Sequence, residues 1–384
     1  MKKAICFLGW MSLLSGLLFG QEYERYRTLS DTLIASKHLG FDKKITVTVP
    51  FEWQADVDRS FPLIVVFDRQ NERSHQFILN TIDYLTSNEQ MPSAVIIGIE
   101  SGQQHRYAET LHRVSSEKGQ AGQNEKFLFE ELLPLAEAQF HASSFRLFIG
   151  HSRYGYFTSS LLMTRGRELN GVISLSPFFS QKNVDWTDSL GTLAGNRYPA
   201  RRYYRFGIGN DYPEDYAKME AAIQRLDQPQ VDAQGYLFPE ADHNVTPGLT
   251  IGIALYEIFE EWSRIQARYT ANEQKDLAIL PVLEAEITAV YGNALPFSLG
   301  ILNGKGWYFF NEKEYEKAIA AWDALLAAYP NYSEGYLYIM AAQKALGQDF
   351  SDTQAKFLAS LHRSEIYSQS EKMELKQELA DLLE

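Results

Sequence analysis

The stretch FIGHSRYGYF, residues 148–157, decides the fold that this sequence predicts. An apolar run ends in a glycine, a polar residue and Ser152, and a segment with a helical pattern follows. This order is typical of a nucleophile elbow, a sharp turn between a strand and a helix that exposes a serine hydroxyl at the edge of a sheet. The small residue usual two places after the serine is replaced by Tyr154. We expect its ring to lie near the rim of the site on a slightly opened elbow, the alternative being a structural element of the core.

Outward from this stretch, from Ser30 to about Arg264, short β-rich runs alternate with longer helical patterns. Several of the runs are continuously apolar, which indicates strands buried on both faces of a mostly parallel sheet. The predicted strands are 30–36, 45–50, 62–68, 93–99, 145–150, 172–176, 202–208 and 235–238, and the predicted helices include 125–139, 153–167, 213–226 and 247–264. Eight strands with interleaved helices predict an α/β domain. The first two strands follow one another without a helix, so we expect that edge to be antiparallel.

Beyond about Arg264 only helical patterns continue, and part of them resembles a tetratricopeptide repeat (TPR). Residues at the offsets of that repeat are Leu302, Gly306, Phe309, Tyr315, Ala318, Trp322, Leu325 and Pro330. A weaker copy follows at a 34-residue step, with Gly347 before Phe350. We therefore expect a hydrolase-type domain over 21–265, a helical connector over 266–298 and a TPR-like domain over 299–384. The helices would offer a surface to a protein partner or a second copy; the alternative is an ordinary helical hairpin packed on the main domain.

The first residues, MKKAICFLGWMSLLSGLLFGQ, read as a signal peptide over 1–20, the alternative being a retained membrane anchor. Cys6 is the only cysteine and lies well before the expected cleavage point, so a lipoprotein is not predicted. A mature chain from about Gln21 has no thiol, which excludes disulfides, thiolate metal sites and cysteine catalysis. We expect a periplasmic or secreted protein without a membrane span in its mature chain.

The net charge of the chain limits the kinds of partner that it can bind. Removal of Lys2 and Lys3 changes the formal net charge from −13 to −15. An acidic chain without a basic run is a poor candidate for binding nucleic acid or an anionic membrane surface.

A nucleophilic serine needs a base and an orienting acid, which in this architecture follow it in the order serine, acid, histidine. Of the eight histidines, only His243 lies after Ser152 and inside the α/β domain. His151 should point away from the active face, because neighbouring residues on a tight turn diverge. We expect Asp211 to be the acid, because it comes directly after the strand over 202–208. Asp215 and Glu214 are rivals for this role, and Asp211 could instead cap the helix that follows it.

The oxyanion formed on attack needs backbone N–H donors. One should be the N–H of Arg153, at the start of the helix after the nucleophile. The second should come from the turn after the strand over 62–68, at Arg69 or Gln70. No metal or organic cofactor is required, and the only close pair of potential metal ligands is Asp242 and His243.

These residues carry a resemblance to the esterase family of α/β-hydrolases. That family includes siderophore esterases resembling enterochelin esterase, S-formylglutathione hydrolase, and feruloyl or acetyl-xylan esterases. The matching stretches are ITVTVP, PLIVVFD, SAVIIGIES followed by Arg106, FLFEELLPLAEAQF, RLFIGHS, VISLSP and ADHNVTP. The resemblance implies an α/β-hydrolase fold and a triad of serine, acid and histidine, carried here by Ser152, Asp211 and His243. Two pairs depart from the family pattern, Tyr154-Gly155 after the elbow serine and Asp68-Arg69 after the third strand.

We therefore expect an exported serine esterase that hydrolyses a small-molecule carboxylic ester through an acyl-enzyme on Ser152. The alternative is a catalytically weak, hydrolase-like binding module with a TPR-type partner surface. Tyr107, Phe178, Phe179 and Trp186 either line an aromatic pocket or belong to the core.

Overall fold

The computed structural model describes residues 25–29, 31–55, 59–113, 118–271 and 275–384. The predicted signal peptide, 1–20, lies outside these residues. Among the described residues, no helix is both long enough and apolar enough to cross a membrane.

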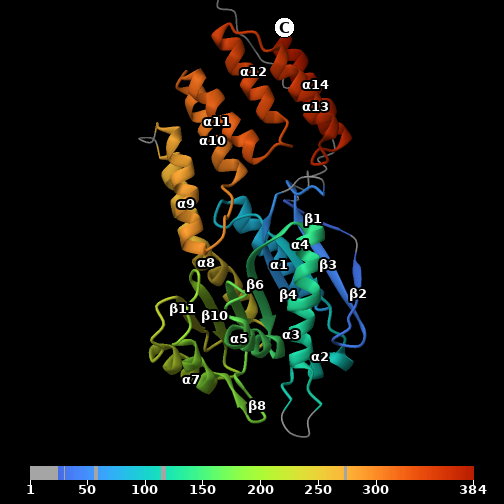
Figure 1. Ribbon diagram of the computed structural model, residues 1–384, viewed down its shortest axis with the longest axis vertical. Helices are drawn as coiled ribbons and strands as arrows, with labels where there is room; N and C mark the ends of the chain where they lie inside the picture. Colours follow the sequence, from blue (N-terminus) through green and yellow to red (C-terminus); the bar gives the residue numbers. More distant parts are fainter. Residues whose placement is uncertain (1–24, 30, 56–58, 114–117, 272–274) are drawn as a thin grey trace, which may run out of the picture.

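A mixed sheet forms the centre of the α/β part (Figure 1). Its strands run in the order β1, β3, β5, β4, β6, β7, β10, β11, with β2 also paired to β3. Their bounds are β1 Tyr26–Thr28, β2 Thr32–Ala35, β3 Asp42–Pro50, β4 Phe61–Phe67, β5 Val95–Ile99, β6 Ala142–His151, β7 Gly171–Leu175, β10 Arg202–Ile208 and β11 Val231–Leu237. The pairs from β5 to β11 are parallel, whereas β1, β2 and β5 pair antiparallel with β3. The predicted, mostly parallel sheet and its antiparallel edge are thus confirmed. The predicted number of eight strands is wrong, because among the described residues the sheet has nine, β1 adding a further antiparallel strand beside β3.

The sheet is buried on both faces because successive residues of its strands point to opposite sides. In β4, Ile64 and Val66 belong to the core on one face, and Leu63, Val65 and Phe67 to the core on the other. The first face is covered by α1 (Glu72–Ser87) and α8 (Thr246–Thr270). The second is covered by helices between β5 and β11: α2 Gln103–Thr110, α3 Ala121–Lys126, a π-helical turn Phe127–Leu132, α4 Leu133–Phe140, α5 Arg153–Arg165 and α7 Pro213–Gln224.

Short elements that the sequence pattern did not predict follow β7. They are the hairpin of β8 (Ser180–Gln181) and β9 (Val184–Asp185), α6 (Trp186–Ser189) and a 3₁₀ turn, Leu190–Leu193. They lie over the carboxyl end of the sheet, beside α7 (Figure 1).

The C-terminal part is helical, as predicted. After a 3₁₀ turn, Leu277–Ile279, its helices are α9 Leu280–Tyr291, α10 Leu299–Asn311, α11 Tyr315–Ala328, α12 Glu334–Leu346, α13 Ser351–Arg363 and α14 Gln369–Leu383. Helices α10 to α13 pack in sequence order as antiparallel neighbours. Assignment of these helices to the tetratricopeptide family stays a prediction.

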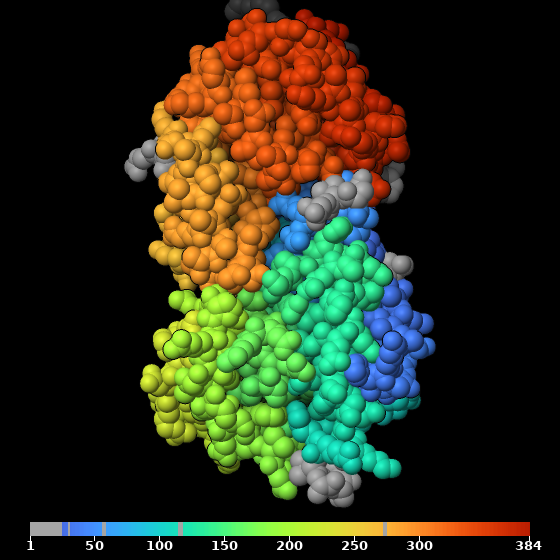
Figure 2. Space-filling model, in the orientation of Figure 1, coloured from blue at the N-terminus to red at the C-terminus, as the bar shows by residue number. Residues whose placement is uncertain are grey.

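The connector over 266–298 is part of the common core. The hydroxyl of Tyr291 donates to the carbonyl of Ile258 at 3.1 Å and accepts from the N–H of Trp262 at 3.0 Å. One continuous cluster of buried side chains runs from the first face of the sheet through Trp262 and Tyr291 to Trp322 in α11. The two parts accordingly form one body in the space-filling view, with the helices stacked on the α/β part (Figure 2).

The helices lie at the amino ends of the parallel strands. Helix α8 starts at the carboxyl edge, just after His243, and its 25 residues span about 37 Å back across the sheet. Two hydrogen bonds link the helical part to the amino edge of the sheet. Ser144, near the start of β6, donates to the side chain of Asn293, and Asn170, just before β7, donates to the carbonyl of Tyr291. The loops at the carboxyl ends therefore face away from α10 to α14 (Figure 1).

Candidate active site

Ser152 occupies a strained turn between β6 and α5. Its backbone has φ 58° and ψ −115°, a region that residues with a side chain rarely adopt. The N–H of Ser152 donates to the carbonyl of Leu175 at the end of β7 at 2.8 Å, which holds the turn against the sheet. A Cβ on Gly150 would lie 2.3 Å from the carbonyl oxygen of Tyr154, so glycine is required there for the helix to start this close to the strand. This is the geometry of a nucleophile elbow.

The predicted acid and base lie beyond the ends of the next strands in the sheet. Asp211 follows β10 and His243 follows β11, and Nδ1 of His243 lies 2.5 Å from Oδ2 of Asp211. Gly209 permits the approach of the two loops, because a Cβ there would lie 2.2 Å from the carbonyl oxygen of Ala241. Since a carboxylate accepts, Nδ1 carries the proton and Nε2 is left as the basic nitrogen.

Asp211, and not its rivals, contacts the histidine. Asp215 and Glu214 lie in the first turn of α7, and no hydrogen bond between either of them and His243 is present among the described residues. Burial favours a higher pKa for Asp211, but hydrogen bonds from His243 and Ser176 outweigh it and lower the pKa below the usual value. The carboxylate is therefore held in its charged form opposite the imidazole.

Ser176 is a member of this group that the sequence did not reveal. It follows β7 directly, with φ 44°, and its Oγ donates to Oδ2 of Asp211 at 2.7 Å. Its Oγ also lies 3.1 Å from Nδ1 of His243 and can accept from it. Ser176 thus fixes both partners of the pair.

His151 does not point away from the active face, so that prediction is wrong. Its Nε2 donates to the carbonyl of His243 at 3.1 Å, and the two rings lie 4.7 Å apart. The loop that carries His243 folds back over the end of β6, so a side chain that diverges from Ser152 still meets it. Burial, and then the neighbouring His243, lower the pKa of His151 to about 4, so His151 is neutral at pH 7.

Proton transfer requires Ser152 to meet Nε2 of His243. The hydrogen bonds of the described residues include none between Ser152 Oγ and His243. Catalytic hydrogen bonds of this kind are often long until substrate binds. The elbow and the histidine loop are nevertheless tied together through His151.

The two predicted oxyanion donors differ in availability. The N–H of Arg153 opens α5, where the first backbone donors have no partner in the helix. The N–H of Arg69 already donates to the carbonyl of Ile99 at 3.0 Å, because the turn after β4 continues the pairing with β5, so Arg69 offers no free donor. The N–H of Gln70, the other alternative, makes no hydrogen bond within the described part of the chain.

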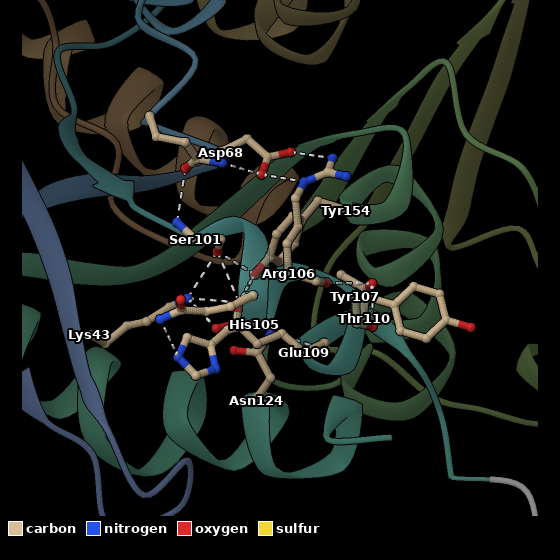
Figure 3. Close-up of polar contacts among 12 residues, drawn as sticks. Lys43, Asp68, Ser101, His105, Arg106, Tyr107, Glu109, Thr110, Asn124 and Tyr154 are labelled. Carbon is tan, nitrogen blue, oxygen red and sulfur yellow. Dashed lines mark hydrogen bonds and ion pairs between the residues drawn. The ribbon is translucent and has the colours of Figure 1, made fainter. Parts of the chain in front are cut away.

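Tyr154 lies in the core, so the prediction that its ring lies at the rim is wrong. The side chain is completely buried and stacks on Phe67, with ring centroids 4.4 Å apart. Its hydroxyl donates to Glu109 and lies 2.6 Å from Oγ of Ser101 (Figure 3). The close approach at the elbow is made by Gly150, so the side chain at 154 is free to turn into the space between β4 and α2.

The hydroxyl of Tyr154 ends on a buried ion pair. Nζ of Lys43 lies 2.7 Å from both carboxylate oxygens of Glu109, and these side chains are 2% and 0% exposed. Ser101 Oγ accepts from Lys43 and donates to Glu109, each at 2.9 Å. Burial, and then Glu109, raise the pKa of Tyr154, which therefore remains a neutral donor.

A second ion pair joins the turn after β4 to the elbow. Arg106 donates to Asp68 with Nε at 2.8 Å and Nη2 at 2.6 Å (Figure 3). Its Nη2 also donates to the carbonyl of His151 at 3.3 Å. Such two-point pairing fixes orientation as well as distance. The turn that carries Gln70 is thereby held beside Ser152.

The aromatic residues near the site divide between pocket and core. Phe179 is completely buried and Trp186 nearly so. Tyr107 is 44% exposed and Phe178 is partly exposed, and both lie beside the guanidinium of Arg153. Of these four side chains, Tyr107 and Phe178 therefore reach the surface beside Arg153, and Phe179 and Trp186 belong to the core.

Comparison with known families confirms the resemblance. Residues 36–216, which include the elbow and Asp211, match the family model described as "Putative esterase". This part of the chain resembles that esterase family in sequence. The chain is accordingly a hydrolase enzyme with the α/β fold of the esterases, and a small molecule is its substrate.

Solved structures share this fold at low sequence identity. An IroE-like serine hydrolase from Shewanella oneidensis has a TM-score of 0.61 and 15% identity, with 78% of this chain and 98% of that chain covered. An uncharacterised protein from Capnocytophaga ochracea has a TM-score of 0.59 and 13% identity, with 92% and 100% covered. The second match extends over most of the helices after the α/β part. No curated protein matches the chain in sequence.

Proposed function

We propose that the protein is an exported serine esterase that hydrolyses a carboxylic ester through an acyl-enzyme on Ser152. One observation supports the proposal: Ser152 occupies a strained elbow, and the adjacent His151 ties this elbow to the loop of His243, which is hydrogen-bonded to Asp211. An elbow conformation of this kind is energetically unfavourable unless the surrounding structure imposes it, and such strain is concentrated at functional sites.

In the proposed reaction, Oγ of Ser152 attacks the ester carbonyl carbon while Nε2 of His243 takes the hydroxyl proton. The resulting oxyanion accepts hydrogen bonds from the N–H of Arg153 and the N–H of Gln70. The bond to the alcohol oxygen then breaks, and His243 returns the proton to the leaving alcohol. Asp211 stays ionised throughout and stabilises the imidazolium, with Ser176 fixing its orientation.

The second half repeats these roles with water. Nε2 of His243 takes a proton from a water molecule, whose oxygen attacks the acyl carbon. Collapse of this intermediate breaks the bond to Ser152 Oγ, to which His243 returns the proton, and a carboxylic acid leaves. Overall, one ester and one water molecule are converted into one alcohol and one carboxylic acid.

The alternative, a weak hydrolase-like binding module, rests on Tyr154 at the elbow and on Arg69 in place of a glycine after the third strand. The side chain of Tyr154 is buried and leaves the turn in its elbow conformation, which removes the first argument. The second argument keeps its weight for Arg69, whose N–H is already bonded to Ile99, so the proposed reaction depends on the N–H of Gln70. Binding of a protein partner or a second copy by the C-terminal helices stays a separate expectation.

Turnover of 4-nitrophenyl acetate tests the proposed function. Ser152→Ala and His243→Ala should each lower kcat by a factor on the order of 10³ or more, with little change in KM. Ser180→Ala, an exposed serine on the nearby hairpin, serves as the matched control and should keep the wild-type rate. Equal rates in wild type and Ser152→Ala would refute the proposal.

Export is proposed from the first twenty residues alone. Expression of the full chain in a bacterium with a periplasm should give a mature protein that begins at about Gln21 in the periplasmic fraction. An intact N-terminus in the cytoplasm, read by mass spectrometry, would contradict this.

A further inference from the structure

Arg153, the residue after the nucleophile, carries a guanidinium that pairs with no carboxylate of the described residues. Its Cζ lies 4.1 Å from the ring centroid of Tyr107 and 5.9 Å from that of Phe178. In the described part of the chain no Asp or Glu forms an ion pair with it. The neighbouring charged or titratable groups that act on the pKa of Arg153 are Tyr107, Arg106 and Tyr212. By contrast, Arg106, on the other side of the elbow, is paired at two points with Asp68.

The partners that Arg153 does have are neutral. With the amide of Gln181 oriented so that its oxygen faces Arg153, Nη1 donates to that oxygen at 2.7 Å, and the amide nitrogen donates to the carbonyl of Thr110 at 3.3 Å. The guanidinium has five N–H donors in a planar fork, so donors remain for a ligand. The side chain is partly buried, and this burial lowers the pKa of Arg153. A partly desolvated cation without a counter-charge is unfavourable, and a bound anion would relieve that cost.

The guanidinium shares a rim with the catalytic base. The ring of Phe178 lies 6.1 Å from that of Tyr212, and Tyr212 lies 5.9 Å from the imidazole of His243. Arg153, Phe178, Tyr212 and His243 therefore form one row of neighbours at the carboxyl edge of the sheet. A substrate whose ester group reaches Ser152 can place another group along this row.

We propose that Arg153 is a specificity-determining residue that binds a carboxylate carried by the ester substrate. The proposal rests on the proposed esterase function and names its substrate class, an ester with a free carboxylate in its acyl or alcohol part. A guanidinium and a carboxylate match in geometry through two parallel N–H···O hydrogen bonds. The rings of Tyr107 and Phe178 shield this pair from water, which strengthens it.

Two pairs of esters test the proposal. In the first, 4-nitrophenyl hydrogen glutarate and 4-nitrophenyl methyl glutarate differ in a charge on the acyl part. In the second, 3-acetoxybenzoate and its methyl ester differ in a charge on the leaving alcohol. For each protein and pair, the measured quantity is the ratio of kcat/KM for the anionic ester to kcat/KM for the neutral one. Any loss of folded enzyme cancels in this ratio.

We expect wild-type protein to prefer the anionic member of at least one pair. Arg153→Gln should lower that ratio roughly ten- to hundredfold, the range for one charge-assisted interaction. Arg153→Lys should lower it less, because the charge remains but the planar fork is lost. The control Arg167→Gln removes the same charge from the amino edge of the sheet and should leave the ratio unchanged. In wild type the preference should weaken as salt is added.

Hydrolysis of both members of each pair with the same ratio in wild type and Arg153→Gln would overturn this inference alone. If wild type hydrolyses none of the four esters, the proposed esterase function fails and the inference falls with it. A ratio that drops equally in Arg167→Gln would show a general charge effect and would also overturn the assignment to Arg153.

Discussion

Replacement of Tyr154 tests how the elbow tolerates a large residue. Its ring stacks on Phe67, and its hydroxyl donates to Glu109, which belongs to a buried ion pair with Lys43. We predict that Tyr154→Phe keeps the elbow and the reactivity of Ser152 but destabilises the fold, whereas Tyr154→Gly prevents stable folding.

The structure sets the expected magnitudes. Tyr154→Phe removes one hydrogen bond to a charged group, a loss of about 1.5–3 kcal/mol in the free energy of unfolding. The lower part of this range is expected, because Glu109 keeps its contacts with Lys43 and Ser101. Tyr154→Gly also deletes a fully buried ring, about 3–5 kcal/mol, and places glycine in a helix, about 1 kcal/mol. The sum, on the order of 5 kcal/mol or more, rivals the whole stability of a typical domain.

Urea unfolding measures these losses, and labelling by a fluorophosphonate probe measures the reactivity of the elbow. Tyr156→Phe is the matched control, because the hydroxyl of Tyr156 contacts neutral groups, Nδ1 of His112 at 3.2 Å and the side chain of Trp186. Tyr156→Phe should lower the free energy of unfolding by about 0.5–1.5 kcal/mol, less than Tyr154→Phe does. A Tyr154→Gly protein with wild-type stability and faster turnover of bulky esters would show that the ring of Tyr154 does not stabilise the core.

The remaining predictions concern the acid, its neighbour, pH and the C-terminal part. Asp211→Asn should lower kcat by a factor on the order of 10³ or more, whereas Asp215→Asn, a matched control outside the contact with the imidazole, should be nearly neutral; the reverse result would move the acid to Asp215. Ser176→Ala removes a hydrogen bond that lowers the pKa of Asp211, so the acid limb of the kcat profile should shift to higher pH, and an unchanged profile would count against its positioning role. Burial lowers the pKa of His75 from 6.5 to about 4, so between these pH values the unfolded chain binds a proton that the folded chain does not. The free energy of unfolding should therefore fall as the pH drops through this window, by up to about 1.4 kcal/mol per pH unit. His75→Gln should make this pH dependence, measured by urea unfolding, less steep. A chain ending at Arg268 should be poorly soluble and unstable, because the core it shares with the later helices is opened; soluble protein with wild-type unfolding would show that the connector is dispensable.

The strands and the order of the site residues were predictable because they depend on local pattern. Runs such as that of β4 are apolar throughout, and a buried parallel strand needs no partner to be recognised. The proposed triad of Ser152, Asp211 and His243 was predictable as a set of neighbours because each residue lies just beyond a strand end in the expected chain order, and Asp211 and His243 are in contact in the structure. Parallel strands bring those ends to one edge whatever the intervening residues are.

The contacts that could not be predicted depend on distant parts of the chain. The place of Tyr154 is set by Phe67 and Glu109, which lie far from it in sequence. Ser176 carries no local signal, because serine after a strand is common in turns. The loss of Arg69 as an oxyanion donor follows from its pairing with Ile99, which only the register of β4 and β5 reveals.

Mass spectrometry after reaction with a fluorophosphonate probe tests most directly whether Ser152 is the nucleophile. We expect one adduct per chain, on the peptide that contains Ser152, with slow labelling in His243→Ala and none in Ser152→Ala. An adduct on another residue, or labelling that persists at the wild-type rate in Ser152→Ala, would contradict it.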